Sequence, residues 1–161
     1  ALQVQCSDLS ALPAELRQQR FDHVIANPPY FDRATSTPAQ DAGREMALGE
    51  ATPLEIWVDV ASRRLAPKGQ ATFIHRAERL PDLLSCMASR LGSLEVLPLQ
   101  PRPGRTAKLV LVRARKGGRA AFRLHAPVLM HQGDRHERDA ESYTPQIRSV
   151  LRDAAALSFP D

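Results

Sequence analysis

A short apolar run that ends at two consecutive prolines constrains this chain more than any other feature of its sequence. Residues 21–26, Phe-Asp-His-Val-Ile-Ala, have the apolar character of a buried parallel strand, and the tetrapeptide Asn27-Pro28-Pro29-Tyr30 follows at once. Because proline has no backbone N–H, a central strand cannot continue through it. Ligands of open α/β sheets bind at the carboxyl ends of strands, so the tetrapeptide occupies the position of a candidate site.

The rest of the chain alternates strand-like and helical patterns. Strands are expected at residues 2–6 (ending at Ser7-Asp8), 71–74, 94–98 and 107–114, with a turn at 116–119 and residues 122–124 extending a terminal hairpin. Apolar side chains at helical spacing predict helices over residues 54–65, 81–91 and 145–156, the first of them capped by Thr52. Residues 10–20 indicate a polar connection or short helix, and residues 31–51 a loop. This alternation predicts an α/β fold with a mostly parallel sheet.

Composition is typical of one packed domain. Of the 161 residues, 43% are hydrophobic and 25% charged, so we expect a single domain over residues 1–161. No apolar run reaches the length of a membrane span, and the first residues have no basic region before an apolar stretch, so neither membrane insertion nor secretion is expected. Cys6 and Cys86 have no metal-ligand spacing and are expected to be free thiols in a reducing cytoplasm. The chain begins without methionine, directly in a strand-like pattern, so we expect it to be part of something longer.

Positive charge is concentrated in one stretch of the sequence. The formal net charge is +4, and no acidic residue lies between Val96 and Gly133. Eight basic residues fall in that interval: Arg102, Arg105, Lys108, Arg113, Arg115, Lys116, Arg119 and Arg123. This density favours a polyanionic partner such as nucleic acid, because each phosphate contact releases counterions whatever the base sequence. A solvated, arginine-rich hairpin is the alternative.

The tetrapeptide resembles motif IV of the S-adenosylmethionine-dependent methyltransferases that modify exocyclic or amide nitrogens. Asn27 is the only asparagine in the chain, and Tyr30 is one of two tyrosines. An exocyclic amine is a poor nucleophile because its lone pair is delocalised into the ring. The resemblance implies that the Asn27 side-chain oxygen and the Pro28 carbonyl accept both amino hydrogens and localise that lone pair. The two prolines, Pro28 and Pro29, would hold these acceptors in place, and Tyr30 would stack on the flipped-out base.

A wider pattern extends over most of the chain, in Asp8-Leu9, residues 64–70, Phe73-Ile74, residues 80–91, residues 101–112 and Ser142-Tyr143-Thr144. Together these segments resemble the bacterial tRNA(Val) adenine-N6-methyltransferase family. The resemblance implies a Rossmann-like class I methyltransferase fold with strand order 3-2-1-4-5-7-6 and an antiparallel C-terminal hairpin. It also implies S-adenosyl-L-methionine as cofactor and tRNA as partner. Cofactor contacts are then expected from Asp8, Leu9 and Asn27, and RNA contacts from Phe31, Arg44, Arg102, Arg105 and Lys108.

One part of the family's pattern is absent. Such enzymes carry a glycine-rich loop after their first strand, whereas the first glycine here is Gly43, downstream of the tetrapeptide. We therefore expect the first two strands and the loop of the family fold to be missing from this chain. Two alternatives stay open. One is glutamine methylation of release factors, which uses the same tetrapeptide on a side-chain amide. The other is an inactive fragment that only binds RNA.

The histidines are weaker candidates. His131 and His136, with Asp134 between them, lack the helical spacing of a metal site, so no metal is expected. His23 and His75 lie within apolar runs and are expected to be packed side chains, and Trp57 is expected in the core.

Overall fold

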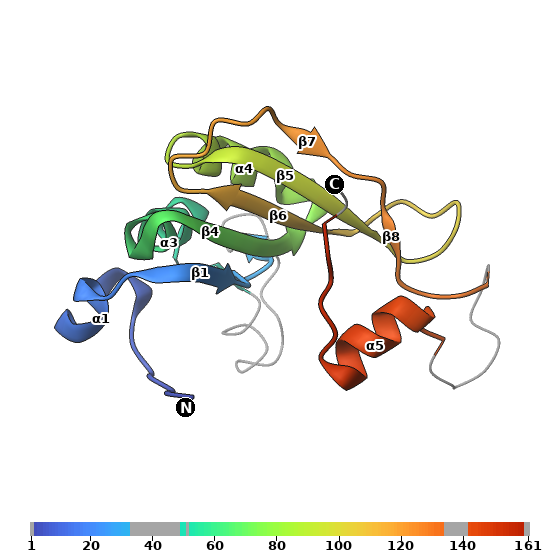
Figure 1. Cartoon of the computed structure of the whole chain (residues 1–161), viewed down its shortest axis with the longest axis horizontal. Coiled ribbons are helices and arrows are strands. Elements are labelled where there is room, and N and C mark those ends of the chain that lie inside the picture. The colour runs from blue at the N-terminus through green and yellow to red at the C-terminus, as the bar shows by residue number, and fades with distance from the viewer. Residues whose placement is uncertain (1, 33–48, 51, 134–141, 160–161) are drawn as a thin grey trace.

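The computed structural model describes residues 2–32, 49–50, 52–133 and 142–159 (Figure 1). The strands of its main sheet are β1 (Phe21–Ala26), β4 (Leu65–Arg76), β5 (Gly92–Gln100), β6 (Leu109–Arg115), β7 (Arg123–Leu124) and β8 (Val128–Leu129). They are arranged in the order β1-β4-β6-β5-β7, with β8 also paired to β5. A separate parallel pair joins β2 (Phe31–Asp32) to β3 (Gly49–Glu50), within the stretch expected to be loop.

Helices and short 3-10 turns connect or flank these strands. They are η1 (Leu9–Ala11), α1 (Ala14–Gln18), α3 (Leu54–Arg64), η2 (Ala77–Arg79), α4 (Leu80–Ala88) and α5 (Pro145–Asp153). In the parts of the chain that the structure describes, no helix is long and apolar enough to cross a bilayer.

The order of the strands confirms the part of the expected Rossmann-like order that these residues form. The strands β1, β4, β6 and β5 lie side by side, as strands 4, 5, 7 and 6 of the implied order do. β1 is parallel to β4, whereas β6 is antiparallel to both β4 and β5, which confirms the antiparallel hairpin. Among the described strands of this sheet, β1, β4, β5, β7 and β8 run in one direction and β6 runs in the other, so the sheet is mostly parallel, as expected.

The strand expected at residues 2–6 does not form. Its apolar side chains are solvated, with Leu2 92% and Val4 90% exposed. An extended segment becomes a strand only when a neighbour satisfies its backbone groups, and no described strand lies beside the outer edge of β1. These residues alternate like a strand, but the described chain contains no neighbouring strand with which they pair.

Two further local expectations are wrong. Residues 122–124 do not extend the hairpin, because β7 pairs in parallel with β5 instead. Thr52 does not cap α3, since Pro53 occupies the N-cap position and no side chain caps the helix. The turn expected at residues 116–119 does form, with Gly117 at a φ of 70° that favours glycine.

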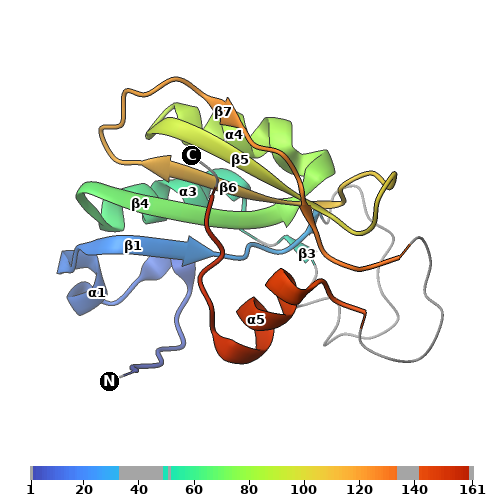
Figure 2. The same cartoon turned by 45° about the vertical axis from the view of Figure 1, so that its right-hand side comes forward.

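Side chains of alternating direction build one core on each face of the sheet. The first core contains Phe73, Val96 and Val112 with Val58 of α3 and Met87 of α4. The second contains Leu97, Leu99 and Ile147 of α5, against which Leu157 and Phe159 of the C-terminal segment pack. Accordingly α3 and α4 lie on one side of the sheet, and α5 with the C-terminal segment lies on the other (Figures 1 and 2).

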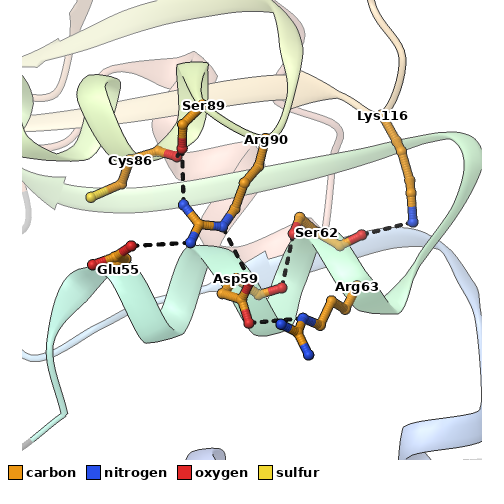
Figure 3. Close-up of polar contacts among 8 residues, drawn as sticks. All are labelled: Glu55, Asp59, Ser62, Arg63, Cys86, Ser89, Arg90 and Lys116. Atoms are coloured by element: carbon orange, nitrogen blue, oxygen red, sulfur yellow. Dashed lines mark hydrogen bonds and ion pairs between the residues drawn. The ribbon is translucent and has the colours of Figure 1, made fainter.

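A polar network joins α3 to the segment after α4 and to the end of β6 (Figure 3). The Arg90 guanidinium binds Glu55 at 3.1 Å and Asp59 at 3.2 Å, so it links two turns of α3. Lys116 donates to the Ser62 carbonyl at 2.9 Å near the end of the same helix. These contacts fix α3, and α3 leads directly into β4 beside β1.

Candidate active site

The tetrapeptide leaves β1 with side chains of alternating direction. Ala26 is buried at the end of the strand, Asn27 is exposed, and Pro28 is fully buried. Because alternate residues of an extended chain point to opposite faces, Asn27 turns away from the α3–α4 core while Pro28 packs toward it. The Asn27 side chain makes no hydrogen bond to any other described residue, so its amide group is open to a ligand.

Tyr30 packs against a histidine from the neighbouring strand. Its ring centroid lies 5.8 Å from that of His75, with 48° between the ring planes. Tyr30 is half-buried, whereas His75 is fully buried, which confirms that His75 is a packed side chain. Nothing in the sequence indicates this contact, because the two residues are far apart along the chain and no local pattern links them.

The directions of the strands bring the tetrapeptide to the same edge as the loop between β5 and β6. β4 and β5 are both antiparallel to β6, so they run in the same direction as β1. The carboxyl ends of these three strands therefore share one edge, to the right in Figure 2, which we call the carboxyl edge. The loop at residues 101–108, between β5 and β6, also lies there. The turn at residues 116–119 lies at the opposite, amino edge.

Two cofactor candidates lie before β1. Asp8 caps η1, and its Oδ1 accepts hydrogen bonds from the Ser10 backbone N–H at 2.8 Å and the Ser10 hydroxyl at 2.7 Å. These two hydrogen bonds lower the pKa of the exposed Asp8 carboxyl. Leu9 borders a hollow of about 210 Å³ against α3 that includes Ile56 and Val60. No hydrogen bond or ring contact joins Asp8 to Asn27 in the described residues.

The RNA candidate Arg102 holds two chain segments together. Its guanidinium donates to the Gln132 and Gly133 carbonyls, the latter at 3.1 Å, and to the Ser142 hydroxyl at 3.1 Å. Arg105 and Lys108, in the same loop, are exposed. At the carboxyl edge, Arg102 is therefore held by hydrogen bonds within the protein, whereas Arg105 and Lys108 face solvent.

The other five bases of the acid-free stretch do not belong to that edge. Arg113 and Arg123 bind Glu95 at 2.9 and 3.0 Å, and His125 binds the same carboxylate at 2.9 Å. Burial alone would raise the pKa of Glu95, but the hydrogen bonds and charges of these partners hold it below its usual value. The others are Arg115 and Lys116, which donate to backbone carbonyls, and Arg119, which is exposed at the amino edge. The stretch is thus not one continuous basic surface.

Only some of the remaining RNA and metal candidates lie in the part of the chain that the structure describes. Phe31 begins β2, directly after the tetrapeptide. Arg44, Asp134 and His136 lie outside the described residues. His131 stacks on Tyr143 with centroids 4.8 Å apart, and the described residues contain no group of side chains that could hold a metal ion.

Two expectations for core side chains have different outcomes. Trp57 is half-buried and packs on the first core, as expected. His23 is exposed rather than packed. The reason is that Val24 and Ala26 face the first core, so His23 lies on the opposite face of β1, which no described element covers.

Comparisons with known proteins agree with the fold. No family model matches the chain. A solved structure of a predicted O-methyltransferase from Agrobacterium tumefaciens superposes with a TM-score of 0.68 at 28% identity, over 94% of this chain and 62% of that one. The chain has a Rossmann-like class I methyltransferase fold.

Sequence comparison also matches the chain to curated tRNA methyltransferases. The tRNA1(Val) (adenine(37)-N6)-methyltransferase of Porphyromonas gingivalis is 36% identical over 104 residues, which are 63% of this chain and 40% of the relative. The protein of that name from Shewanella baltica is 32% identical over 96 residues, 58% of this chain and 40% of the relative. This methyltransferase homologue therefore spans less than half the length of the curated relatives that it matches.

Proposed function

We propose that this methyltransferase homologue provides the amine-binding part of an enzyme that methylates the N6 amino group of an adenine in tRNA. The observation that carries the proposal is the Asn-Pro-Pro-Tyr segment at the carboxyl end of β1, with Asn27 exposed between two buried residues. The names of the curated relatives support the choice of tRNA and of adenine.

The chemistry of the tetrapeptide suits an aromatic amine. With Asn27 Oδ1 and the Pro28 carbonyl each accepting one amino hydrogen, the nitrogen lone pair is withdrawn from the ring and directed at the incoming methyl group. Proline at both central positions fixes φ, so these acceptors need little reorganisation when the substrate binds. The Tyr30 ring supplies a surface on which a flipped-out purine stacks.

The residues present also fit S-adenosyl-L-methionine as the methyl donor. Both hydrogen bonds to Asp8 end on Oδ1, which leaves Oδ2 without a partner in the described residues and available to a donor group of the cofactor. We assign Asp8, Leu9 and Asn27 to its binding. When bound, the cofactor supplies a sulfonium methyl group that is transferred by direct displacement, so alignment and electrostatics carry most of the rate effect.

The loop at residues 101–108 is the proposed contact for the tRNA backbone. Arg105 and Lys108 are exposed at the carboxyl edge, which they share with the tetrapeptide. Arg102 ties this loop to Gly133 and Ser142, so we assign it to the shape of the surface. Phe31 and Arg44, which follow the tetrapeptide in the chain, complete the proposed RNA contacts.

The decisive experiment removes the Asn27 amide. In the complete natural protein, Asn27→Ala should lower single-turnover methylation of unmodified tRNA by about a hundredfold or more, as the loss of one preorganised polar group does. Its affinity for S-adenosylmethionine, measured by calorimetry, should change far less. Gln18→Ala, which removes an exposed amide from α1, is the matched control and should keep wild-type activity.

Two results would reject the proposal. Wild-type methylation by Asn27→Ala would mean that the tetrapeptide does not activate the amine. Methyl transfer to a glutamine-containing release-factor peptide, with none to tRNA, would favour the amide-directed alternative.

A further inference from the structure

A buried imidazole lies directly behind the tetrapeptide. In the β1–β4 pairing Ala26 is opposite Phe73, and Pro28 and His75 each follow two residues later. Both are fully buried on the face that α3 and α4 cover. His75 is thus the side chain of β4 that lies abreast of the tetrapeptide, beyond the point where the two strands can pair.

One hydrogen bond to the His75 ring defines its tautomer. Nδ1 accepts the backbone N–H of Arg76 at 2.8 Å, so in the neutral ring the proton resides on Nε2. That Nε2 is buried and has no hydrogen-bond partner among the described residues. A buried donor without a partner is costly, and an apolar side chain of similar size would avoid this cost. Burial in the core therefore gives no reason for an imidazole rather than an aliphatic side chain at this position.

The ring contact gives His75 a different role. Tyr30 lies against it at 5.8 Å and 48°, within the range in which aromatic rings attract each other in tilted arrangements. Because His75 belongs to the interior of the sheet, it is a rigid support, whereas Tyr30 lies outside the main sheet, after the end of β1. Tyr30 is half-buried, so part of the residue remains accessible to a ligand.

We propose that His75 is a positioning residue that holds the Tyr30 ring in the orientation needed to stack on a planar amino-heterocycle of the substrate. It touches neither the base nor the methyl donor. This inference rests on the proposed function for the identity of the base, but the contact between the two rings can be tested separately.

The first test observes Tyr30 directly, without substrate. The chain has two tyrosines, Tyr30 and Tyr143, so labelled tyrosine rings give few NMR signals and Tyr143 serves as an internal reference. His75→Leu should shift and broaden the Tyr30 ring signals and leave those of Tyr143 in place. His75→Phe, which keeps an aromatic ring, should restore sharp Tyr30 signals. Unchanged Tyr30 signals in a folded His75→Leu protein would overturn the proposal, and so would broadening that His75→Phe does not reverse.

The second test is a double-mutant cycle in the complete protein. His75→Leu should raise KM for tRNA by roughly three- to tenfold with a smaller change in kcat, and His75→Phe should recover most of the loss. In a Tyr30→Ala background, His75→Leu should have no further effect on KM, because its action passes through the missing ring. An equal rise of KM in both backgrounds would show that His75 does not act through Tyr30, and it would overturn the proposal.

The two tests also separate this inference from the proposed function. If the NMR signals respond as expected but the wild-type protein methylates no tRNA, the proposed function fails and the positioning of Tyr30 stands. Ser62→Ala, which changes a buried polar side chain of α3, is the control for general loosening of the core and should leave the Tyr30 signals unchanged.

Discussion

At the scale of single residues, burial separates the chemical roles of neighbouring side chains. Asn27 is exposed and unpaired among the described residues, and its neighbours Ala26 and Pro28 are buried. The amide is therefore held rigidly at its base while its polar end faces solvent. This combination suits an acceptor that must meet a substrate hydrogen without reorganising first.

Burial also determines how His75 responds to pH. Removal from water lowers the pKa of its imidazole below the ordinary 6.5, and the positive charges of Arg79 and Arg76 lower it further against smaller opposing effects of Asp82 and Glu78. Below pH 6.5 the unfolded chain then binds more protons at this position than the folded one. The free energy of unfolding should consequently fall as the pH is lowered through and below that value.

Urea denaturation at about pH 7.5 and about pH 5.5 checks this expectation, since these values lie on either side of the unfolded-state pKa. The wild-type protein should lose more stability between them than His75→Phe, which has no proton to bind at that position. Parallel losses in the two proteins would show that His75 takes no part in the acid sensitivity.

At the scale of elements, β4 and the hairpin of β5 and β6 distribute the basic residues over both ends of the sheet. Arg105 and Lys108 lie in the loop at the carboxyl edge, whereas Lys68 and Arg119 are exposed at the amino edge. Of the other basic residues of the hairpin region, Arg113 and Arg123 bind Glu95. Arg115 and Lys116 donate hydrogen bonds to backbone carbonyls. The density of basic residues in the sequence therefore suggests a larger continuous basic surface than the folded chain has.

Binding of tRNA at different salt concentrations tests this division. The double variant Arg105→Ala/Lys108→Ala should lower the slope of log affinity against log salt by up to about two, since each lost phosphate contact removes somewhat less than one. Lys68→Ala/Arg119→Ala makes the same change of charge at the amino edge and should leave the slope unaltered. Equal reductions in the two variants would place the RNA elsewhere or spread it over both edges.

At the scale of the whole molecule, one side of β1 is uncovered. Ile25 is 82% and Phe21 38% exposed on this strand, and no described strand pairs with its outer edge. Unpaired edges with apolar side chains associate with other chains. We expect the 161-residue chain to self-associate as its concentration rises.

A charge on this strand should oppose that association. Ile25→Lys should shift the sedimentation profile toward monomer at micromolar protein concentrations, because a lysine on a strand edge disfavours pairing with another chain. Leu151→Lys changes a side chain that is 55% exposed on α5 and should have little effect. Association that persists unchanged in Ile25→Lys would move the contact away from β1.

Local patterns in the sequence determined much of the fold. The two prolines ended β1 at Ala26, helical spacing located α3, α4 and α5, and glycine located the turn after β6. Each of these features depends on chemistry within a few residues, so the local sequence was enough to predict it. The resemblance of the tetrapeptide to a known motif also singled out Asn27 and Tyr30 as candidate site residues, because that motif is contained in four consecutive residues.

Tertiary structure alone decided the features that depend on partners distant in the chain. Residues 2–6 alternate like a strand but have no described neighbour to pair with, and His23 lies in an apolar run but on a face that nothing described covers. Arg102 has the same local sequence character as its basic neighbours, yet Gly133 and Ser142 supply its hydrogen-bond acceptors. His75 meets Tyr30 only because β4 extends past the end of β1. Pairing, burial and long-range hydrogen bonds are properties of two segments at once, and no pattern within one segment contains them.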